Sequence, residues 1–107
     1  MLTDLVSQGK IRAFGSSTFP AEAIVNAYHV AERRGYGKFR TEQPPYSLIS
    51  RGIERSLLPT TQRLGMGVLT WSPLASGFLS GKVRKDQPVD LTTGRAALTP
   101  FRFDPSI

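Results

Sequence analysis

Three short segments with β-strand character alternate along this chain with stretches of helical pattern, and this alternation most restricts how the chain can fold. The expected strands cover residues 10–16, 39–43 and 68–71. The connections between them are long enough for crossovers, which favours parallel strands in right-handed βαβ units. The pattern predicts an α/β domain. By itself it leaves open whether the sheet closes into a barrel or stays an open, doubly wound sheet.

The helical stretches are recognised by apolar residues that recur at i, i+3, i+4 and i+7. A first helix end, stopped by a glycine, contains Leu2, Leu5, Val6 and Gly9. A second helix has an apolar face made of Ile24, Ala27, Tyr28 and Ala31. A third stretch carries on one side Ile53, Leu57 and Leu64. Pro59 falls inside this third stretch, which predicts a kink or a restart of the helix with Pro59 at its first position.

Polar and aromatic side chains follow each expected strand. Residues 16–18 read Ser-Ser-Thr, residues 43–46 read Gln-Pro-Pro-Tyr, and residues 71–74 read Trp-Ser-Pro-Leu. Because the C-terminal ends of parallel strands meet at one edge, where α/β proteins bind ligands, these segments form a candidate site. The Gln43 amide can both donate to and accept from a carboxamide, and the Trp71 indole can stack on a flat ring.

Composition narrows the range of functions. The 107 residues are 39% apolar and include no cysteine and one histidine, which suits one globular domain and excludes disulfides and thiolate metal sites. The net charge is +6, but the basic residues are scattered. We therefore expect solvated surface or cofactor-phosphate contacts, not a nucleic-acid site. The sequence shows no membrane-spanning run and no signal-peptide core, so we expect a cytoplasmic protein without membrane contact.

Three stretches together carry a resemblance to a known family. Residues 9–19 read Gly-Lys-Ile-Arg-Ala-Phe-Gly-Ser-Ser-Thr-Phe, and residues 42–48 read Glu-Gln-Pro-Pro-Tyr-Ser-Leu. Residues 65–82 read Gly-Met-Gly-Val-Leu-Thr-Trp-Ser-Pro-Leu-Ala-Ser-Gly-Phe-Leu-Ser-Gly-Lys. In this order and spacing they resemble the aldo/keto reductase superfamily, in the branch of bacterial aldo/keto reductases and potassium-channel beta subunits. The resemblance runs from about residue 3 to residue 82, with a weaker tail to about residue 95.

The fold that this resemblance implies is a (β/α)₈ TIM barrel, which needs roughly 250 residues. The chain would then be a partial barrel of about three parallel βα units, which match strands five to seven of the family. Residues 1–82 would form the partial barrel domain. Residues 83–107 contain Pro88, Pro100, Pro105 and Gly94 and would be a loop or extension of it. Because the helical pattern starts at the first residues, we expect an internal start codon, a misplaced gene start or a cut.

The resemblance also implies cofactor roles for residues at the strand ends. Ser17 and Gln43 match positions that hold the nicotinamide carboxamide, and Trp71 matches the aromatic residue that stacks on the nicotinamide. Thr18 stands where relatives often carry Asn, and its hydroxyl retains one of the amide's hydrogen bonds. Contacts to pyrophosphate, ribose or phosphate are implied for Ser72, Leu74, Gly77 and Lys82, and for Arg95 where the match is weaker.

Simpler structural interpretations stand beside these roles. Gln43 can cap a strand end, Trp71 can be a core aromatic residue, and Ser17 can belong to a turn or cap a helix. Lys82 can be an ordinary surface lysine. Two further candidates match no catalytic motif and are expected to be structural or solvent-facing, Tyr46 and His29.

The family's catalytic tetrad of Asp, Tyr, Lys and His lies on strands that nothing here matches. The resemblance therefore implies a fragment of an NADP-dependent aldo/keto reductase, which reduces aldehydes or ketones to alcohols. The fragment would carry the nicotinamide and pyrophosphate side of the NADP(H) site, with no catalytic residue and no metal, and would be inactive alone. It could associate with the missing half of the barrel. The alternatives are a non-catalytic NADP(H)-binding or barrel-completing subunit, and a non-functional gene remnant.

Overall fold

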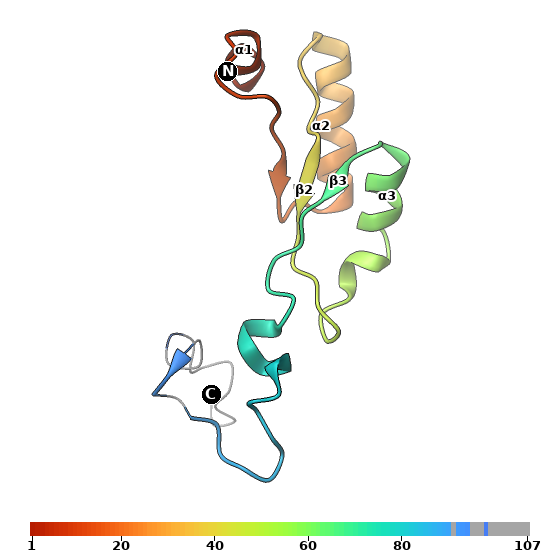
Figure 1. Ribbon diagram of the computed structural model, residues 1–107. Coiled ribbons are helices and arrows are strands. Elements are labelled where there is room, and N and C mark those ends of the chain that lie inside the picture. The colour runs from red at the N-terminus through yellow and green to blue at the C-terminus, as the bar shows by residue number, and fades with distance from the viewer. Residues whose placement is uncertain (91, 95–97, 99–107) are drawn as a thin grey trace.

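The computed structural model describes residues 1–90, 92–94 and 98, and its elements follow the predicted alternation (Figure 1). The helices of this part are α1 (Leu2–Ser7), α2 (Ala21–Arg34) and α3 (Leu57–Arg63). The strands are β1 (Ser16–Ser17), β2 (Thr41–Gln43) and β3 (Gly67–Val68). Two 3₁₀ segments follow β2 and β3, namely η1 (Gly52–Glu54) and η2 (Ala75–Ser80).

The strands form one parallel sheet in the order β1-β2-β3. Ser17 lies opposite Gln43, and Glu42 lies opposite Val68. The connections between the strands contain α2 and α3, so the predicted βαβ crossovers are confirmed (Figure 1). The described part is thus an α/β fold built on three parallel strands.

The regular strands are shorter than the sequence predicts, above all β1, which was expected over residues 10–16. Backbone pairing nevertheless continues outside them. The N–H of Arg40 donates to the carbonyl of Phe14 at 2.9 Å, and the N–H of Trp71 donates to the carbonyl of Pro44 at 3.0 Å. Proline has no N–H to donate, so pairing after β2 is reduced to isolated bonds.

The core lies where α2 and α3 pack on each other and on the sheet. Its apolar side chains are Ile24 and Ala31 of α2 and Leu57 of α3, which are 1%, 7% and 5% exposed. These residues belong to the apolar faces that the helical periodicity predicts. Among the described residues the core also contains buried polar and charged side chains, namely Ser16, Glu42, Thr60 and Thr61.

The two faces of the sheet differ in what covers them. Side chains alternate along a strand, so neighbouring residues point to opposite faces. Ser16 and Glu42 are paired across β1 and β2 and are buried, whereas Ser17 and Gln43 are paired one step further along and are exposed. The first pair therefore faces the helices, and the second pair lies on the face that the described residues leave uncovered.

Helix α1 contributes no buried residue. It ends before Gly9, whose φ of +72° is left-handed, as the predicted glycine stop requires. Its apolar residues Leu2 and Val6 remain 40% and 37% exposed. A groove of about 730 Å³ separates α1 from α2. Helix α1 therefore lies beside the core without sealing it.

Helix α3 begins at Leu57, so the predicted position of Pro59 at the start of a helix is wrong by two residues. The predicted restart itself is confirmed, since η1 ends at Glu54 and α3 is a separate element. The first four N–H groups of a helix have no partner within it. A proline anywhere in the first turn therefore removes no intrahelical hydrogen bond. Gly65 follows the helix with a φ of +69°.

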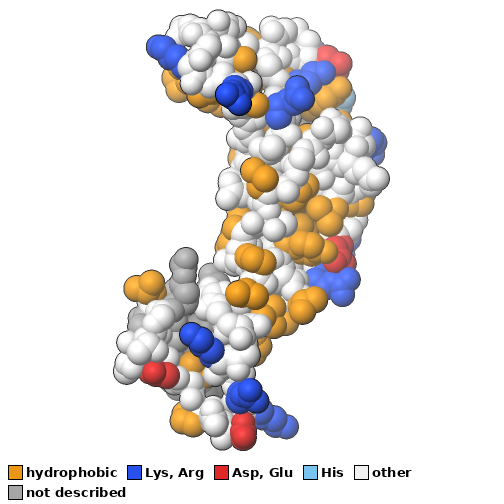
Figure 2. Space-filling model, viewed as in Figure 1, with side chains coloured by type: hydrophobic (Ala, Val, Ile, Leu, Met, Phe, Trp, Pro, Cys, Tyr) orange, Lys and Arg blue, Asp and Glu red, His pale blue; other side chains and the backbone are white. Residues whose placement is uncertain are grey.

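The molecule is extended, with a radius of gyration of 18.4 Å and extents of 56 × 31 × 22 Å. A compact chain of this length would have a radius of about 13 Å. After β3 the chain leaves the sheet and η2 stands apart from it (Figure 1). Figure 2 shows apolar side chains on the surface along the middle of the molecule. No helix among the described residues is long and apolar enough to cross a membrane.

Candidate functional site

Four of the predicted cofactor residues meet at the C-terminal edge of the sheet. Ser17 ends β1, Thr18 follows it, Gln43 ends β2, and Trp71 lies just beyond β3. The Ser17 hydroxyl donates a hydrogen bond to the backbone carbonyl of Gln43 at 3.0 Å, and the Thr18 N–H donates to the same backbone carbonyl at 3.2 Å. The third segment is joined by a bridge between Pro45 and Trp71. We call these four predicted residues, Ser17, Thr18, Gln43 and Trp71, the rim.

Trp71 lines a hollow of about 310 Å³ next to the rim. Ser72 and Tyr46 also line it, and the Tyr46 N–H donates to the Trp71 carbonyl at 3.2 Å. Trp71 is only partly buried and is not among the buried core residues of the described chain. This argues against the interpretation of Trp71 as a core aromatic residue and leaves its ring beside a space that a ligand could enter.

Ser72, Leu74, Gly77 and Lys82, the remaining predicted contacts, lie on the segment that leads away from the sheet (Figure 1). Ser72 and Gly77 have left-handed backbones, with φ of 54° and 98°. Leu74 is 53% exposed. Lys82 is exposed, and its backbone N–H donates to the Ser80 hydroxyl at 3.4 Å.

The segment follows directly from Trp71, and the Gly77 N–H donates within it to the Leu74 carbonyl at 3.0 Å. A further predicted phosphate contact, Arg95, lies outside the described residues. In the described part of the chain, no three His, Asp or Glu side chains are grouped closely enough to hold a metal ion.

The backbone around the candidate site is unusual at several residues that are not glycine. Thr18 has a φ of 59°, Ser72 of 54°, Ala75 of 51° and Ser76 of 59°. The left-handed region costs an L-residue about 1–2 kcal/mol, and β-branched residues such as Thr tolerate it least. Such strain persists where surrounding contacts or a ligand hold it, and it clusters at functional sites.

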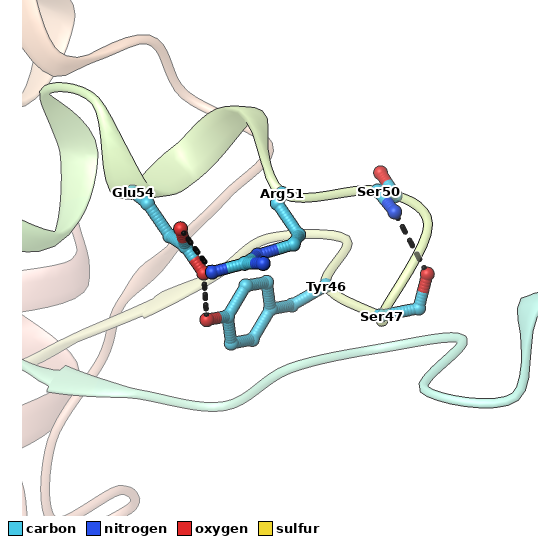
Figure 3. Close-up of polar contacts among 5 residues, drawn as sticks. All are labelled: Tyr46, Ser47, Ser50, Arg51 and Glu54. Atoms are coloured by element: carbon cyan, nitrogen blue, oxygen red, sulfur yellow. Dashed lines mark hydrogen bonds and ion pairs between the residues drawn. The ribbon is translucent and has the colours of Figure 1, made fainter.

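Tyr46 belongs to a polar cluster on the loop after β2 (Figure 3). Its hydroxyl donates to Glu54 at 2.5 Å, and Arg51 donates to both carboxylate oxygens of Glu54 at 2.8 and 3.0 Å. The bond to Glu54, with some desolvation, raises the pKa of Tyr46. The bonds from Arg51 and then Tyr46 lower the pKa of Glu54. A phenol held as a donor in this way is a poor proton source, which supports a structural role.

His29 is exposed, and its Nδ1 lies 3.9 Å from a carboxylate oxygen of Glu32 on the same helix. This solvent-facing position agrees with the expectation from sequence. His29 sits on α2, whose exposed side chains point away from the sheet, so it contributes nothing to the rim.

One buried residue of the site was not singled out from sequence. Glu42 is 0% exposed and accepts hydrogen bonds from the Ser16 hydroxyl and from the Phe19 N–H. The signal was present in the alternating Phe-Arg-Thr-Glu-Gln of the second strand, where an acidic residue next to Gln43 falls on the opposite face. Alternation alone does not say which face the helices cover.

The comparisons with known proteins agree with this architecture. The sequence model of the aldo/keto reductase family matches residues 1–101. The uncharacterized oxidoreductase YrpG of Bacillus subtilis is 43% identical over 93 residues, which are 87% of this chain and 28% of that protein. The NADH-specific methylglyoxal reductase of Escherichia coli is 38% identical over 80% of this chain and 24% of its own length.

Two further similarities extend the range of relatives. A probable voltage-gated potassium channel subunit beta of Oryza sativa is 40% identical over 76% of this chain and 25% of its own. The solved structure of a glycerol dehydrogenase from Gluconobacter oxydans superposes with a TM-score of 0.68 at 33% identity, over 89% of this chain and 27% of that chain. The chain thus spans about a quarter of the length of these relatives.

Proposed function

The chain belongs to the aldo/keto reductase family, and from this premise we propose that it supplies the nicotinamide and pyrophosphate side of the cofactor site of an NADP-dependent reductase. The proposed reaction of the whole enzyme is the reduction of aldehydes or ketones to alcohols. When bound, the cofactor supplies the hydride of that reaction. The residues described here bind and orient it.

The observation that carries the proposal is the convergence of Ser17, Gln43 and Trp71 at one edge of the sheet. The three residues come from separate segments, and hydrogen bonds or backbone bridges join those segments. Their chemistry fits a nicotinamide group, because a hydroxyl and an amide can satisfy a carboxamide and an indole can stack on its ring. Gln43 is exposed on the uncovered face, so its amide is accessible to a ligand.

The pyrophosphate part of the proposal rests on the segment after Trp71. Small residues with left-handed backbones, such as Ser72 and Gly77, allow close approach to main-chain atoms. Lys82 adds an exposed positive charge beyond η2. We assign Ser72, Leu74 and Gly77 to pyrophosphate and ribose, and Lys82 to a phosphate.

A titration of the 107-residue chain with NADPH tests this proposal, because Trp71 is its only tryptophan. We expect saturable quenching of Trp71 emission, and a weaker affinity in Gln43→Ala than in the control Gln62→Ala, an exposed glutamine of α3. Free tryptophan corrects for absorption by the cofactor, and calorimetry replaces emission for Trp71→Ala. Equal affinities of the two glutamine variants would exclude the carboxamide role.

The choice of cofactor is tested in the same titration. We propose NADP(H), with Lys82 as a phosphate ligand, although one relative is named for its specificity for NADH. Parallel titrations with NADPH and NADH should show tighter binding of NADPH and a smaller difference in Lys82→Met. Tighter binding of NADH would assign the site to the other cofactor.

We further propose that the three βα units correspond to strands five to seven of the family barrel and that the catalytic tetrad lies outside this chain. The purified 107-residue chain should then show no NADPH-dependent turnover of small aldehydes or ketones. Hydride transfer to a carbonyl also needs a proton donor, and Tyr46 is engaged as a donor to Glu54. Measurable turnover that Tyr46→Phe abolishes would contradict this assignment.

A second candidate function is a subunit that completes a barrel with another polypeptide. The observation in its favour is the open sheet: in the described part β1 and β3 each pair on one side only. Unpaired strand edges favour association with further strands. Gel filtration with multi-angle light scattering separates the cases, since a barrel-completing subunit should form a complex of defined mass with the chain that carries the other strands.

A further inference from the structure

The polar group with the least access to solvent among the described side chains is Glu42 on β2, which is 0% exposed. One carboxylate oxygen accepts the Ser16 hydroxyl, and the other accepts the Phe19 N–H at 2.9 Å. None of the ion pairs in the described part involves Glu42. A buried carboxylate held by neutral donors alone is costly, and an apolar residue of similar volume often serves stability better.

The two donors flank the part of the rim that comes from β1. Ser16 precedes Ser17, and Phe19 follows Thr18. Glu42 is itself the neighbour of Gln43, whose side chain points to the opposite face. One carboxylate therefore ties both sides of the Ser17–Thr18 turn to the strand end that carries the amide.

The turn needs such a restraint. Thr18 has a left-handed φ of 59°, which is unfavourable for a β-branched residue. The Ser17 hydroxyl and the Thr18 N–H both donate hydrogen bonds to the backbone carbonyl of Gln43, at 3.0 and 3.2 Å. The hydrogen bonds that the Glu42 carboxylate accepts from Ser16 and Phe19 hold the strained pair between two fixed points.

We infer that Glu42 is a positioning residue for recognition of the cofactor's carboxamide, acting through Ser17 and Gln43 from the buried face of the sheet. This inference rests on the proposed function of the rim. Glu42 does not touch the ligand. Its contribution is to keep a hydroxyl and an amide from two strands in a fixed relation, so that both groups of a carboxamide are recognised together.

The test compares two probes, NADP⁺ and its 3-acetylpyridine analogue, in which a methyl ketone replaces the carboxamide. Calorimetry on the 107-residue chain gives the ratio of their dissociation constants. We expect the unmodified protein to prefer NADP⁺ about tenfold, the equivalent of one or two hydrogen bonds. A merely structural role for Glu42 would change both constants together and leave this ratio unchanged.

Glu42→Leu removes both acceptors at similar volume, and the ratio should fall to within about twofold of one. Glu42→Gln should restore most of the preference. Its carbonyl can accept from Phe19, and the Ser16 hydroxyl can turn to accept from its NH₂ group. Ser16→Ala removes one contact only and provides a milder variant if Glu42→Leu does not fold. Thr61→Ala, which removes another buried hydroxyl on α3, should leave the ratio unchanged.

Three results would overturn a part of this account. A preference that survives in both Glu42→Leu and Ser16→Ala would overturn the role of Glu42 and leave the rim intact. An equal loss of the preference for NADP⁺ in Thr61→Ala would show that the loss in Glu42→Leu comes from general destabilisation. Failure of the unmodified protein to bind either probe would instead overturn the proposed cofactor site, and the inference with it.

Discussion

The segment from Ser16 to Val68 and the segment of η2 are held in different ways. The first has a sheet, two crossover helices and buried side chains such as Ile24 and Leu57. Segment η2 has no buried residue, and it is kinked at Ser76 and Gly77, where the backbone is left-handed. One of its hydrogen bonds lies within the segment, from the Ser80 hydroxyl to the Gly77 carbonyl at 2.6 Å.

This contrast divides the candidate site into a scaffolded half and an unsupported half. The residues proposed for the nicotinamide, Ser17 and Gln43, stand on paired strands. The residues proposed for the pyrophosphate lie on the strained segment that leaves the sheet. Strained backbone persists only where something offsets its cost, so the second half should depend on bound cofactor or on contacts from outside the sheet far more than the first.

The largest expected effect on stability comes from a substitution in the core of the scaffolded half. Ile24→Ala should lower the free energy of unfolding by about 2–5 kcal/mol, because it removes buried methyl groups and leaves a cavity. Phe78→Ala in η2, where the side chain is 44% exposed, should cost less than about 1 kcal/mol. Urea unfolding followed by circular dichroism measures both. Similar losses for the two variants would erase the contrast between the halves.

A smaller loss in the free energy of unfolding is expected from a substitution at Gly15, next to the pairing of β1 with β2. A Cβ at Gly15 would collide with the side chain and carbonyl oxygen of Thr41 and lie 3.1 Å from its carbonyl carbon. Gly15→Ala should therefore destabilise the fold by about 1–3 kcal/mol through overpacking. Gly52→Ala is the matched control, since a Cβ there meets nothing within 4 Å. An unaffected midpoint for Gly15→Ala in urea would show that this approach of strands is not essential.

Gly77→Ala tests the unsupported half. Gly77 has a φ of 98° and open space around a Cβ, so the penalty comes from the backbone alone, about 1 kcal/mol. We expect roughly fivefold weaker binding of NADPH with an unchanged urea midpoint. Gly9→Ala makes the same substitution at another glycine with a left-handed backbone, after the end of α1. It should leave the binding of NADPH unchanged. A lower midpoint for Gly77→Ala would mean that η2 folds as part of the core.

The smallest effect on stability concerns the polar cluster of Tyr46, Arg51 and Glu54, on the loop after β2. The pKa of Glu54 is lowered by the bonds from Arg51 and Tyr46, so its contribution is complete above its ordinary pKa and disappears as the pH falls through the lowered value. The pKa of Tyr46 is raised by its bond to Glu54, so that contribution disappears as the pH rises through the raised value.

Unfolding of the unmodified chain and of Tyr46→Phe should therefore differ slightly at neutral pH and converge in acid and in strong base. Unfolding midpoints in urea over a pH series measure this difference. A constant difference across the acidic range would show that Glu54 does not act through its charge.

The main helices and strands, their order and the candidate site could be predicted from the amino-acid sequence alone. Strand-like segments separated by long crossovers predicted a parallel sheet, which is confirmed, and the apolar faces at Ile24 and Leu57 were readable because helical burial repeats at a fixed period. The motifs around Gln43 and Trp71 predicted the family, which the match over residues 1–101 confirms. The roles of individual residues in cofactor binding stay predictions.

The covered face of each strand and the points where regular pairing ends became known from the packing of the folded chain. Alternation places Glu42 and Gln43 on opposite faces, but the packing of the helices determined that Glu42 is the buried one. The strand ends depend on hydrogen bonds between distant segments, such as the bond from the Trp71 N–H to the Pro44 carbonyl. Such bonds form only once the chain has folded, and no local pattern in the sequence encodes their partners.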